Sequence, residues 1–333
     1  MPWYVYIALR HLFPKGKWFP LFTVISALGP GIGVFLIVTV ISVFNGFGHE
    51  IRSKISELQG DILVQKRGLF DDHEKIAVQL LENDSVVQSA PYAHGIVMLQ
   101  KDNLPTYPAI QGIDPDLEEG VVPIDQYLID GDMDSFYDDS VILSVGLARS
   151  VRVEVGDEVD IYTPLMFQRY EQDEVLLPRT MEVAAIYETG WAEVDANTVL
   201  CTLRTMQDFY GLGDSVHGIK LKLVDGADQD RIASELNSQL PPNYRAYTAL
   251  STKAAFLAAV EMEKRMMFFL LFMIVLVACL SILSSLLVSV LRKQREIGLF
   301  SAIGANAKQI AICFCLQGLA VGMVGTACGF IAA

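Results

Sequence analysis

The segment RKQREIGLFSAIGANAKQI, Arg292 to Ile310, lies between two long apolar runs and decides the fold. The run before it is MMFFLLFMIVLVACLSILSSLLVSVL, and the run after it continues from Ile310 to Ala333. Neither run holds a charged side chain, and each has the roughly 20 apolar residues that a helix needs to cross a bilayer. The segment is therefore predicted to be a short turn between two membrane spans.

A third charge-free run, Trp18 to Phe44, predicts another span near the N-terminus. Basic residues precede it, as in a signal peptide. However, the run is longer than the roughly 7 to 15 apolar residues of a signal peptide, and no small-residue cleavage site follows it. We interpret it as an uncleaved span.

The charges are divided sharply along the chain. All but one of the 39 acidic residues lie between Glu50 and Arg265. Loops rich in lysine and arginine stay in the cytoplasm. We therefore expect the N-terminus and the Arg292–Ile310 segment to be cytoplasmic and the acidic middle to be outside. An acidic domain is also a poor partner for nucleic acid. The basic residues outside the middle are Arg10, Lys15, Lys17, Arg292, Lys293, Arg295 and Lys308.

The middle of the chain alternates short strand-like and helix-like stretches, which predicts an α+β domain. The predicted strands are DILVQ, YPAIQGI, SVILSV, EVDIYT, MEVAAIY, NTVLCT and GIKLKLV, and the predicted helices are DHEKIAVQLLEN, LRTMQDFYGL and ADQDRIASELNSQL. At both ends of the domain, apolar residues recur every three or four positions. We expect these ends to be stalk helices that pack together.

The expected divisions are a cytoplasmic segment (1–17), a first span (18–44), an external domain (45–265), a second span (266–291), a cytoplasmic loop (292–309) and a third span (310–333). Within the external domain we expect stalks at 45–60 and 249–265, one part built from 61–114 and 215–248, and an inserted part at 115–214. In the spans, glycines four residues apart, such as Gly325 and Gly329, favour close helix packing.

The sequence shows no catalytic or metal-binding pattern. Its five histidines form no HExxH motif, and the Gly16–Lys17 pair is not part of a P-loop. The acidic runs DGDMDSFYDD and DPDLEE lack the spacing of an EF-hand, so we interpret them as solvated loops. Only Cys201 lies in the external domain, so that domain has no internal disulfide. Energy from ATP would have to come from another subunit.

Two segments closely resemble a known family. Ala8-Leu9-Arg10 before the first span and Ser42-Val43-Phe44-Asn45-Gly46-Phe47 at its outer end, together with LARSVRVEVGDEV in the middle, resemble the LolC/LolE permeases of the lipoprotein-releasing ABC transporter. Lys293 to Gly329 resembles the segment that FtsX-like permeases share, MacB-type exporters included. The resemblance covers nearly the whole chain in the order of the family.

The resemblance implies an α-helical membrane protein with a large periplasmic α+β domain and the mechanotransmission architecture of MacB-like, type VII ABC permeases. It implies a location in the bacterial inner membrane and no catalytic role. The implied partners are a LolD-like P-loop ATPase that binds ATP and Mg, a second permease subunit (a paralogue or an identical copy), triacylated lipoproteins, a LolA-like periplasmic carrier and membrane lipids.

Three sets of residues are candidate sites. The short helix at Glu296–Gly304 has no other part of the chain to dock on, so we expect it to fit a groove on the ATPase; its coupling residues are Arg295, Glu296, Ile297, Phe300, Ile303 and Gly304. A lipid cleft is expected at Ile41, Phe44, Asn45, Phe47, Met266, Met267 and Phe269. A hairpin that grips the carrier is expected at Pro164, Leu165, Met166, Phe167, Leu176, Leu177 and Pro178.

Two other functions stay open at this stage. One is a MacB-like exporter of another substrate or an FtsX-like regulator of cell-wall hydrolases, although the missing P-loop and the large external domain favour lipoprotein release. The other is a membrane-anchored enzyme or receptor. The family also has a fourth span, which we expect in a longer form of this chain. Whether the chain is LolC-like, LolE-like or homodimeric is open.

Overall fold

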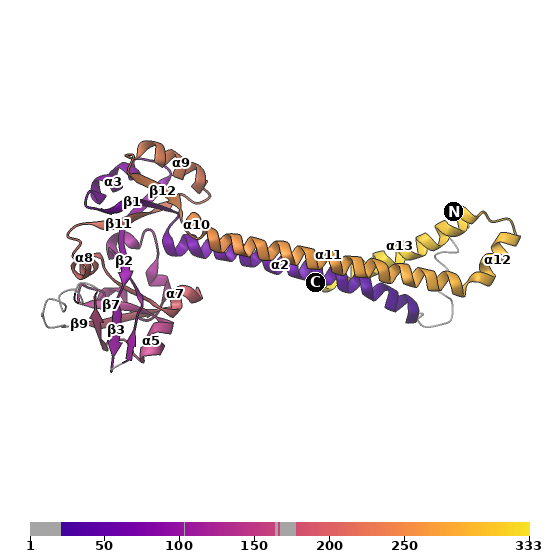
Figure 1. Ribbon diagram of the computed structural model, residues 1–333, viewed down its shortest axis with the longest axis horizontal. Coiled ribbons are helices and arrows are strands. Elements are labelled where there is room, and N and C mark those ends of the chain that lie inside the picture. Colours follow the sequence, from indigo (N-terminus) through magenta and orange to yellow (C-terminus); the bar gives the residue numbers. More distant parts are fainter. Residues whose placement is uncertain (1–20, 103, 164–165, 167–177) are drawn as a thin grey trace. The chain divides into compact units, whose positions relative to one another are not determined.

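The computed structural model describes residues 21–102, 104–163, 166 and 178–333 (Figure 1). The chain divides into a helical unit, Met1–Glu50 with Ala255–Ala333, and an α/β unit, Ile51–Ala254. The α/β unit is thus inserted between two segments of the helical unit.

Four helices of the described chain contribute to the helical unit: α2 (Leu21–Gln59), α11 (Ala254–Arg292), α12 (Gln294–Ala302) and α13 (Ala307–Ala332). Three of them are long and apolar enough to cross a membrane, over Ala27–Gln59, Ala254–Ser284 and Ala307–Ala332. Helix α2 runs without a break from the predicted first span through the predicted stalk. Helix α11 in the same way joins the other predicted stalk to the second span.

Small residues bring α13 against α2. A Cβ atom on Gly325 would overlap the carbonyl oxygen of Ala27, and one on Gly329 would overlap that of Gly31. Gly325 and Gly329 are four residues apart on α13, and Ala27 and Gly31 are four residues apart on α2, so each pair lies on one face of its helix. On α2, Gly33 instead faces Ala278 of α11, with 3.8 Å between the added Cβ and the alanine Cβ.

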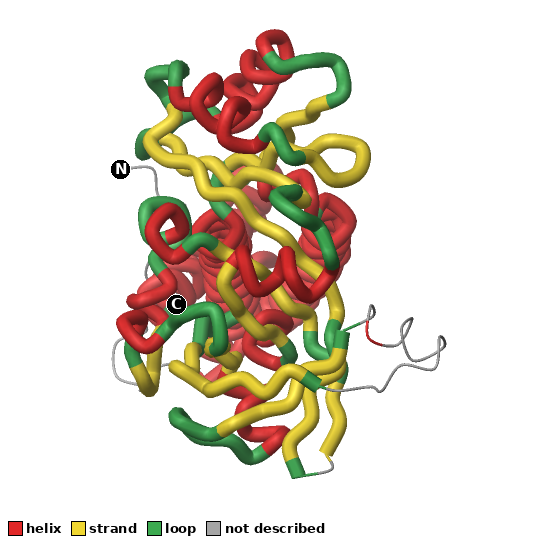
Figure 2. Tube along the Cα trace, turned by 90° about the vertical axis from the view of Figure 1, so that its left-hand side faces the viewer, coloured by secondary structure: helices red, strands yellow, loops and turns green. Residues whose placement is uncertain are grey.

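The α/β unit is built on one mixed sheet, whose strands are yellow in Figure 2. The strand order is β12-β1-β11-β2-β5-β10-β7-β9-β8-β3-β4, and β6 also pairs with β9. The strands are β1 (Ile62–Phe70), β2 (Val86–Ile96), β3 (Met98–Lys101), β4 (Leu104–Thr106), β5 (Ala109–Ile113), β6 (Leu128–Gly131), β7 (Ser140–Ser144), β8 (Glu158–Tyr162), β9 (Arg179–Tyr187), β10 (Thr198–Thr202), β11 (Val216–Leu223) and β12 (Tyr244–Thr248).

Two pairs in this sheet, β5 with β10 and β7 with β9, are parallel, and the other pairs are antiparallel. The β5–β10 pair, in which Ile110 lies opposite Val199, joins the two parts expected from the sequence into one sheet. Strands β3 and β4, which the sequence division placed in the first part, pair instead toward β8.

Alternating side chains place apolar residues on both faces of the central strands. Val199 and Cys201 of β10 belong to the main core, whereas Leu200 between them belongs to a second apolar cluster. This is the two-residue period of a strand that is covered on both faces. Each Leu or Ile that is fully buried in these clusters favours folding by about 1.5–3 kcal/mol.

Helices pack against this sheet from short connections. They are α3 (His73–Leu81), α4 (Pro115–Glu118), α5 (Val145–Val151), α7 (Ala192–Ala196), α8 (Leu203–Tyr210), α9 (Gln229–Gln239) and α10 (Ala249–Thr252), with 3-10 turns at Ile124–Tyr127 and Met133–Ser135. Ile76 and Leu80 of α3, and Ile232 and Leu236 of α9, are buried in the main core.

The edge strand β12 is capped by a side chain. Asn237 of α9 donates from Nδ2 to the carbonyl oxygen of Ala246 at 2.7 Å and accepts the Ala246 N–H on Oδ1 at 2.9 Å. An exposed strand edge offers such groups to other chains. The amide of Asn237 occupies the place that a neighbouring strand would take at this residue.

We predict that Gly329→Val weakens the fold by about 1–3 kcal/mol, because the new side chain would overlap the backbone of α2. The measurement is the melting temperature of the detergent-solubilised protein. Gly322→Val is the matched control, since a Cβ at Gly322 meets nothing within 4 Å. Equal melting temperatures for the two variants would contradict the observed helix contact.

Candidate functional site

Helix α12 packs one of its faces against its own chain. Ile297 and Phe300 line a small apolar pocket together with Ile310, Cys313 and Phe314 of α13. The expectation that this helix has no other part of the chain to dock on is therefore wrong for these two residues. Their spacing of three along α12 turns them to the same side, toward the next helix.

The exposed apolar residues of α12 are different ones. Leu299 is 63% exposed and Ile303 is 80% exposed. Leu299 lies in the last turn of α12, and Ile303 follows four residues later as the residue that caps the helix. Ile303 was predicted as a coupling residue, whereas Leu299 was not among the predicted residues, because the sequence pattern drew attention to the face of Ile297 and Phe300. Arg295 and Glu296 are also exposed.

Gly304 ends α12 and allows the chain to turn into α13. Its φ of 97° lies in the left-handed region, where a side chain is strained. The next residue donates its N–H to the carbonyl oxygen of Phe300 at 2.9 Å, which closes the helix end. Asn306 then starts α13 with a capping box that it forms with Gln309. The turn is thus fixed by local chemistry.

The residues of the predicted lipid cleft lie on α2 and α11. A hydrogen bond joins the two helices close to these residues. Lys264 donates from Nζ to Oδ1 of Asn45 at 2.8 Å. Phe47, Met266 and Phe269 are 54%, 55% and 64% exposed. The remaining members, Ile41, Phe44 and Met267, are half-buried. The two helices therefore present a large apolar surface beside a polar contact.

The predicted carrier hairpin falls mostly outside the described residues. Pro164, Leu165, Phe167, Leu176 and Leu177 lie outside them, whereas Met166 and Pro178 are described and half-buried. The strands on either side, β8 and β9, pair antiparallel, with Ile161 opposite Arg179.

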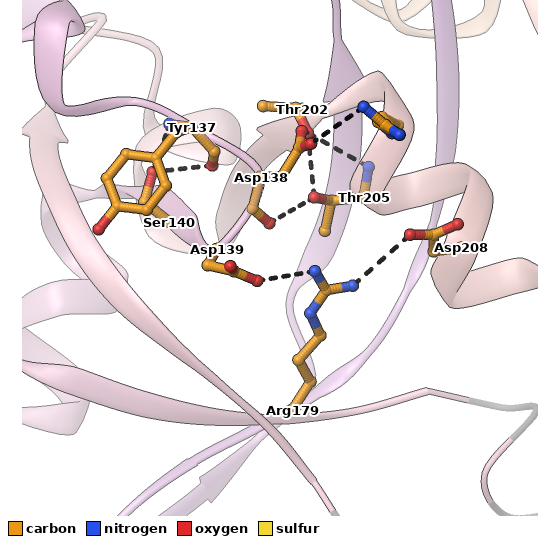
Figure 3. Close-up of polar contacts among 9 residues, drawn as sticks. Tyr137, Asp138, Asp139, Ser140, Arg179, Thr202, Thr205 and Asp208 are labelled. Atoms are coloured by element: carbon orange, nitrogen blue, oxygen red, sulfur yellow. Dashed lines mark hydrogen bonds and ion pairs between the residues drawn. The ribbon is translucent and has the colours of Figure 1, made fainter.

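Polar contacts fix the strand that follows this segment, as Figure 3 shows. The Arg179 guanidinium donates to Asp139 at 2.8 Å and lies 3.8 Å from the carboxylate of Asp208 in α8. Asp138 in the same loop accepts a hydrogen bond from the hydroxyl of Thr202 at 2.6 Å. The start of β9, at Arg179, is therefore held to α8 and to the loop before β7.

These contacts also explain the acidic run that precedes β7. Asp132 accepts the N–H of Ser135, and Asp138 and Asp139 are used as described above. Across the described residues, no group of three or more His, Cys, Asp or Glu side chains is arranged to hold a metal ion. Burial raises the pKa of the Cys201 thiol, which disfavours the reactive thiolate.

Asp61 joins three elements at the point where α2 gives way to the sheet. It is 7% exposed, and its Oδ1 accepts hydrogen bonds from Ser56 of α2 and from Gln229 of α9, the latter at 2.9 Å. Its Oδ2 accepts the N–H of Leu223 at 2.8 Å. No part of the sequence pattern singled out this residue, because an aspartate after a helix is common in turns.

The backbone of Asp61 completes the same junction. Its N–H donates to the carbonyl oxygen of Leu221 in β11 at 2.8 Å, and its carbonyl oxygen accepts the N–H of Ala249 at 3.0 Å. Ala249 begins α10, the short helix that leads into α11. The end of α2 and the start of α10 are thus fastened to the sheet through one residue.

Two family models match the chain. The MacB-like periplasmic core domain covers residues 23–239, and the FtsX-like permease C-terminal domain covers residues 268–333. The first covers most of α2 and the α/β unit up to the end of α9. The second covers the later part of α11, α12 and α13.

Curated relatives match almost the whole chain. The lipoprotein-releasing system transmembrane protein LolC of Neisseria meningitidis is 28% identical over 98% of this chain and 80% of its own length. LolC of Xylella fastidiosa is 28% identical over 99% and 80%. LolE of Haemophilus influenzae is 22% identical over 92% and 75%.

The fold and these matches define a membrane permease with a periplasmic-type α+β domain, a class of transmembrane subunits that are not themselves catalytic. The chain belongs to the family of the MacB-like periplasmic core domain, and within it to the LolC/LolE permeases. The resemblance inferred from the sequence is confirmed.

Two histidines of the α/β unit lie against each other. The rings of His94 and His217 are 4.5 Å apart, and Nδ1 of His217 accepts the backbone N–H of His94 at 3.4 Å. Burial lowers the pKa of both rings below the usual 6.5, and for His217 the neighbouring His94 adds to the effect. The folded protein therefore binds fewer protons here than the unfolded chain does around and below pH 6.5.

We predict that this pair makes the free energy of unfolding fall as the pH is lowered through and below 6.5, because protons favour the unfolded chain. His217→Gln should flatten that dependence, since it removes one of the two titrating rings. Val78→Gln, at a 63% exposed position of α3 that does not titrate, is the control and should leave the slope unchanged. Denaturant unfolding between pH 7.5 and 5 measures the slope; identical slopes in all three proteins would contradict the prediction.

Proposed function

We propose that this chain is the permease subunit of an ABC transporter that extracts lipoproteins from the outer leaflet of the inner membrane and passes them to a periplasmic carrier. The observation that carries this is the match to lipoprotein-releasing transmembrane proteins over nearly the whole chain. The FtsX-like and MacB-like domains alone would fit export of another substrate equally well. The matches to LolC and LolE, which cover 92–99% of the chain, favour lipoprotein release.

In this proposal, the conformational change that ATP hydrolysis drives is transmitted to the permease at α12. A separate P-loop ATPase subunit, LolD-like, binds ATP and Mg and contacts the exposed side of α12 around Leu299, Ile303 and Arg295. Ile297 and Phe300 would support this contact indirectly, because they hold α12 against α13. This arrangement places the N-terminus and α12 in the cytoplasm, as the basic residues around them favour.

The lipoprotein would be taken up at the apolar surface of α2 and α11. Moving acyl chains out of a bilayer costs about 0.8 kcal/mol for each CH₂ that is exposed to water, so an apolar surface is needed along the route. Phe47, Met266 and Phe269 offer one, and methionine and phenylalanine adapt to acyl chains of varied shape. A second permease subunit, a paralogue or an identical copy, would close the other side of this cleft.

Transfer to the carrier would use the α/β unit. The segment between β8 and β9 remains the candidate for contact with a LolA-like carrier. The strand that follows it, β9, is held in place by Arg179. Asp61 would transmit movement of α2 and α11 to the sheet, because it joins the end of α2 and the start of α10, which leads into α11, to the sheet. Movement of those helices would therefore move the sheet as well.

We predict that Ile303→Asp, alone or with Leu299→Asp, abolishes co-purification of the P-loop ATPase while the permease stays folded. The reason is that a charge replaces an exposed apolar side chain that the ATPase would cover. Val78→Asp is the control, since Val78 is 63% exposed on α3 of the other unit. Pull-down from membranes of cells that make the full transporter measures the association.

Unchanged recovery of the ATPase with the double α12 variant would refute this contact. If the unaltered permease brings down no P-loop ATPase at all, the transporter proposal itself fails. If it brings down the ATPase but no lipoprotein under turnover conditions, the alternative of a different exported substrate is favoured.

A further inference from the structure

Two glycines of α2 are not explained by packing. A Cβ atom added to Gly46 or to Gly48 would meet nothing within 4 Å in the described part of the chain. Gly31 of the same helix is different, since a Cβ there would lie 3.1 Å from the carbonyl oxygen of Gly325. Contact with another helix of this chain therefore explains Gly31 but not Gly46 and Gly48.

Both glycines lie in the interior of a continuous helix. Helix α2 continues through them to Gln59, and neither residue has the positive φ that would make a glycine necessary. Glycine weakens a helix interior more than any residue except proline, because it loses the most backbone freedom and leaves the backbone open to water. Asn45 and His49, beside them, are also weak helix formers. The stretch from Asn45 to His49 is therefore a weak segment of α2.

The helix beside this weak segment is built in the opposite way. Lys264 of α11 donates to Asn45, which places that part of α11 next to the weak segment. Helix α11 has no glycine or proline in its 39 residues, and from Ala254 to Met267 it consists mostly of Ala, Leu, Met, Glu, Lys and Arg. These are the strongest helix formers. At the same level, α2 is thus weak and α11 is strong.

The weak segment lies just before α2 passes from one compact unit to the other. The boundary between the units falls between Glu50 and Ile51. Ile51 and Ile55, beyond the boundary, are 6% and 3% exposed, so the helix is well packed from there on. Gly46 is exposed and Gly48 is half-buried. Packing therefore restrains the weak segment less than the part of α2 that follows it.

We propose that Gly46 and Gly48 form a hinge at which α2 bends while α11 beside it stays straight. Glycine is one of the few residues at which helices kink sharply, and hinges are short segments that absorb changes in φ and ψ. Phe47 lies between the two glycines, so bending would move its ring relative to α11. If the proposed function holds, this movement would reshape the apolar surface that takes up the lipoprotein. The bend itself does not depend on that function.

Hydrogen exchange measures the hinge directly, in the full chain held in lipid nanodiscs. Amides of a helix that opens locally exchange faster than amides of a helix that stays closed. Protection factors correct for the intrinsic exchange rate of each sequence. We expect residues 46–50 of α2 to be protected about tenfold less than residues 258–264 of α11, because of the two glycines.

A double variant removes the hinge without adding a clash. Gly46→Ala with Gly48→Ala should raise the protection of residues 46–50 about tenfold, because each change favours the local helix about fourfold. Gly322→Ala is the matched control, since its Cβ also meets nothing within 4 Å but lies on α13. It should leave α2 unchanged. In the reconstituted transporter, the double variant should release less than half as much lipoprotein per ATP as the control.

Three results would overturn the hinge. One is equal protection of the two stretches in the parent protein. Another is protection of residues 46–50 that the double variant leaves unchanged. The third is loss of the second permease subunit when the double variant is purified, which would assign the glycines to close contact between subunits.

The release measurement separates the hinge from the proposed function. Normal release per ATP in a double variant with slowed exchange would refute the role of the bend in transport. If the unaltered transporter releases no lipoprotein, the proposed function fails, and hydrogen exchange still decides whether α2 bends at Gly46 and Gly48.

Discussion

The junction at Asp61 is the constraint on which the α/β unit depends. One buried carboxylate accepts hydrogen bonds from α2, from α9 and from the end of β11, while its backbone pairs with β11 and with the start of α10. Leaving such a carboxylate without its donors costs about 1–3 kcal/mol for each group, so the junction is held as a unit. The two helices that enter and leave the sheet are thereby fixed at their ends.

Other features serve the same mechanical purpose. Glycines let α13 lie against α2, and α12 rests on α13 through Ile297 and Phe300, so that the turn between the spans has a defined shape. In the α/β unit, Arg179 holds the start of β9 to α8, and Asn237 closes the edge of β12. None of these groups is arranged for chemistry. They keep packed elements together, which is what the proposed coupling to an ATPase subunit would require.

The sequence predicted the elements better than their arrangement. All seven expected strands and all three expected helices of the middle region exist, because their apolar periods are set locally. Strand β2 was missed because Pro91 and Gly95 interrupt its pattern. The contact of Ile297 and Phe300 with α13 was not predicted, because packing between helices has no signature in sequence. Asp61 and the Glu118–Lys220 pair depend on residues more than 100 positions apart, which no local pattern reveals.

The most direct test of the proposed mechanism is the amount of lipoprotein released per ATP hydrolysed by the reconstituted transporter carrying Asp61→Asn. The change keeps the shape of the side chain but removes one of its two acceptor oxygens, and Asp225→Asn in the exposed turn after β11 is the matched control. If Asp61 couples the helices to the sheet, the transporter with Asp61→Asn hydrolyses ATP at the normal rate and releases little lipoprotein. The transporter with the control substitution behaves as the parent. Normal release per ATP in a folded Asp61→Asn transporter would contradict this mechanism.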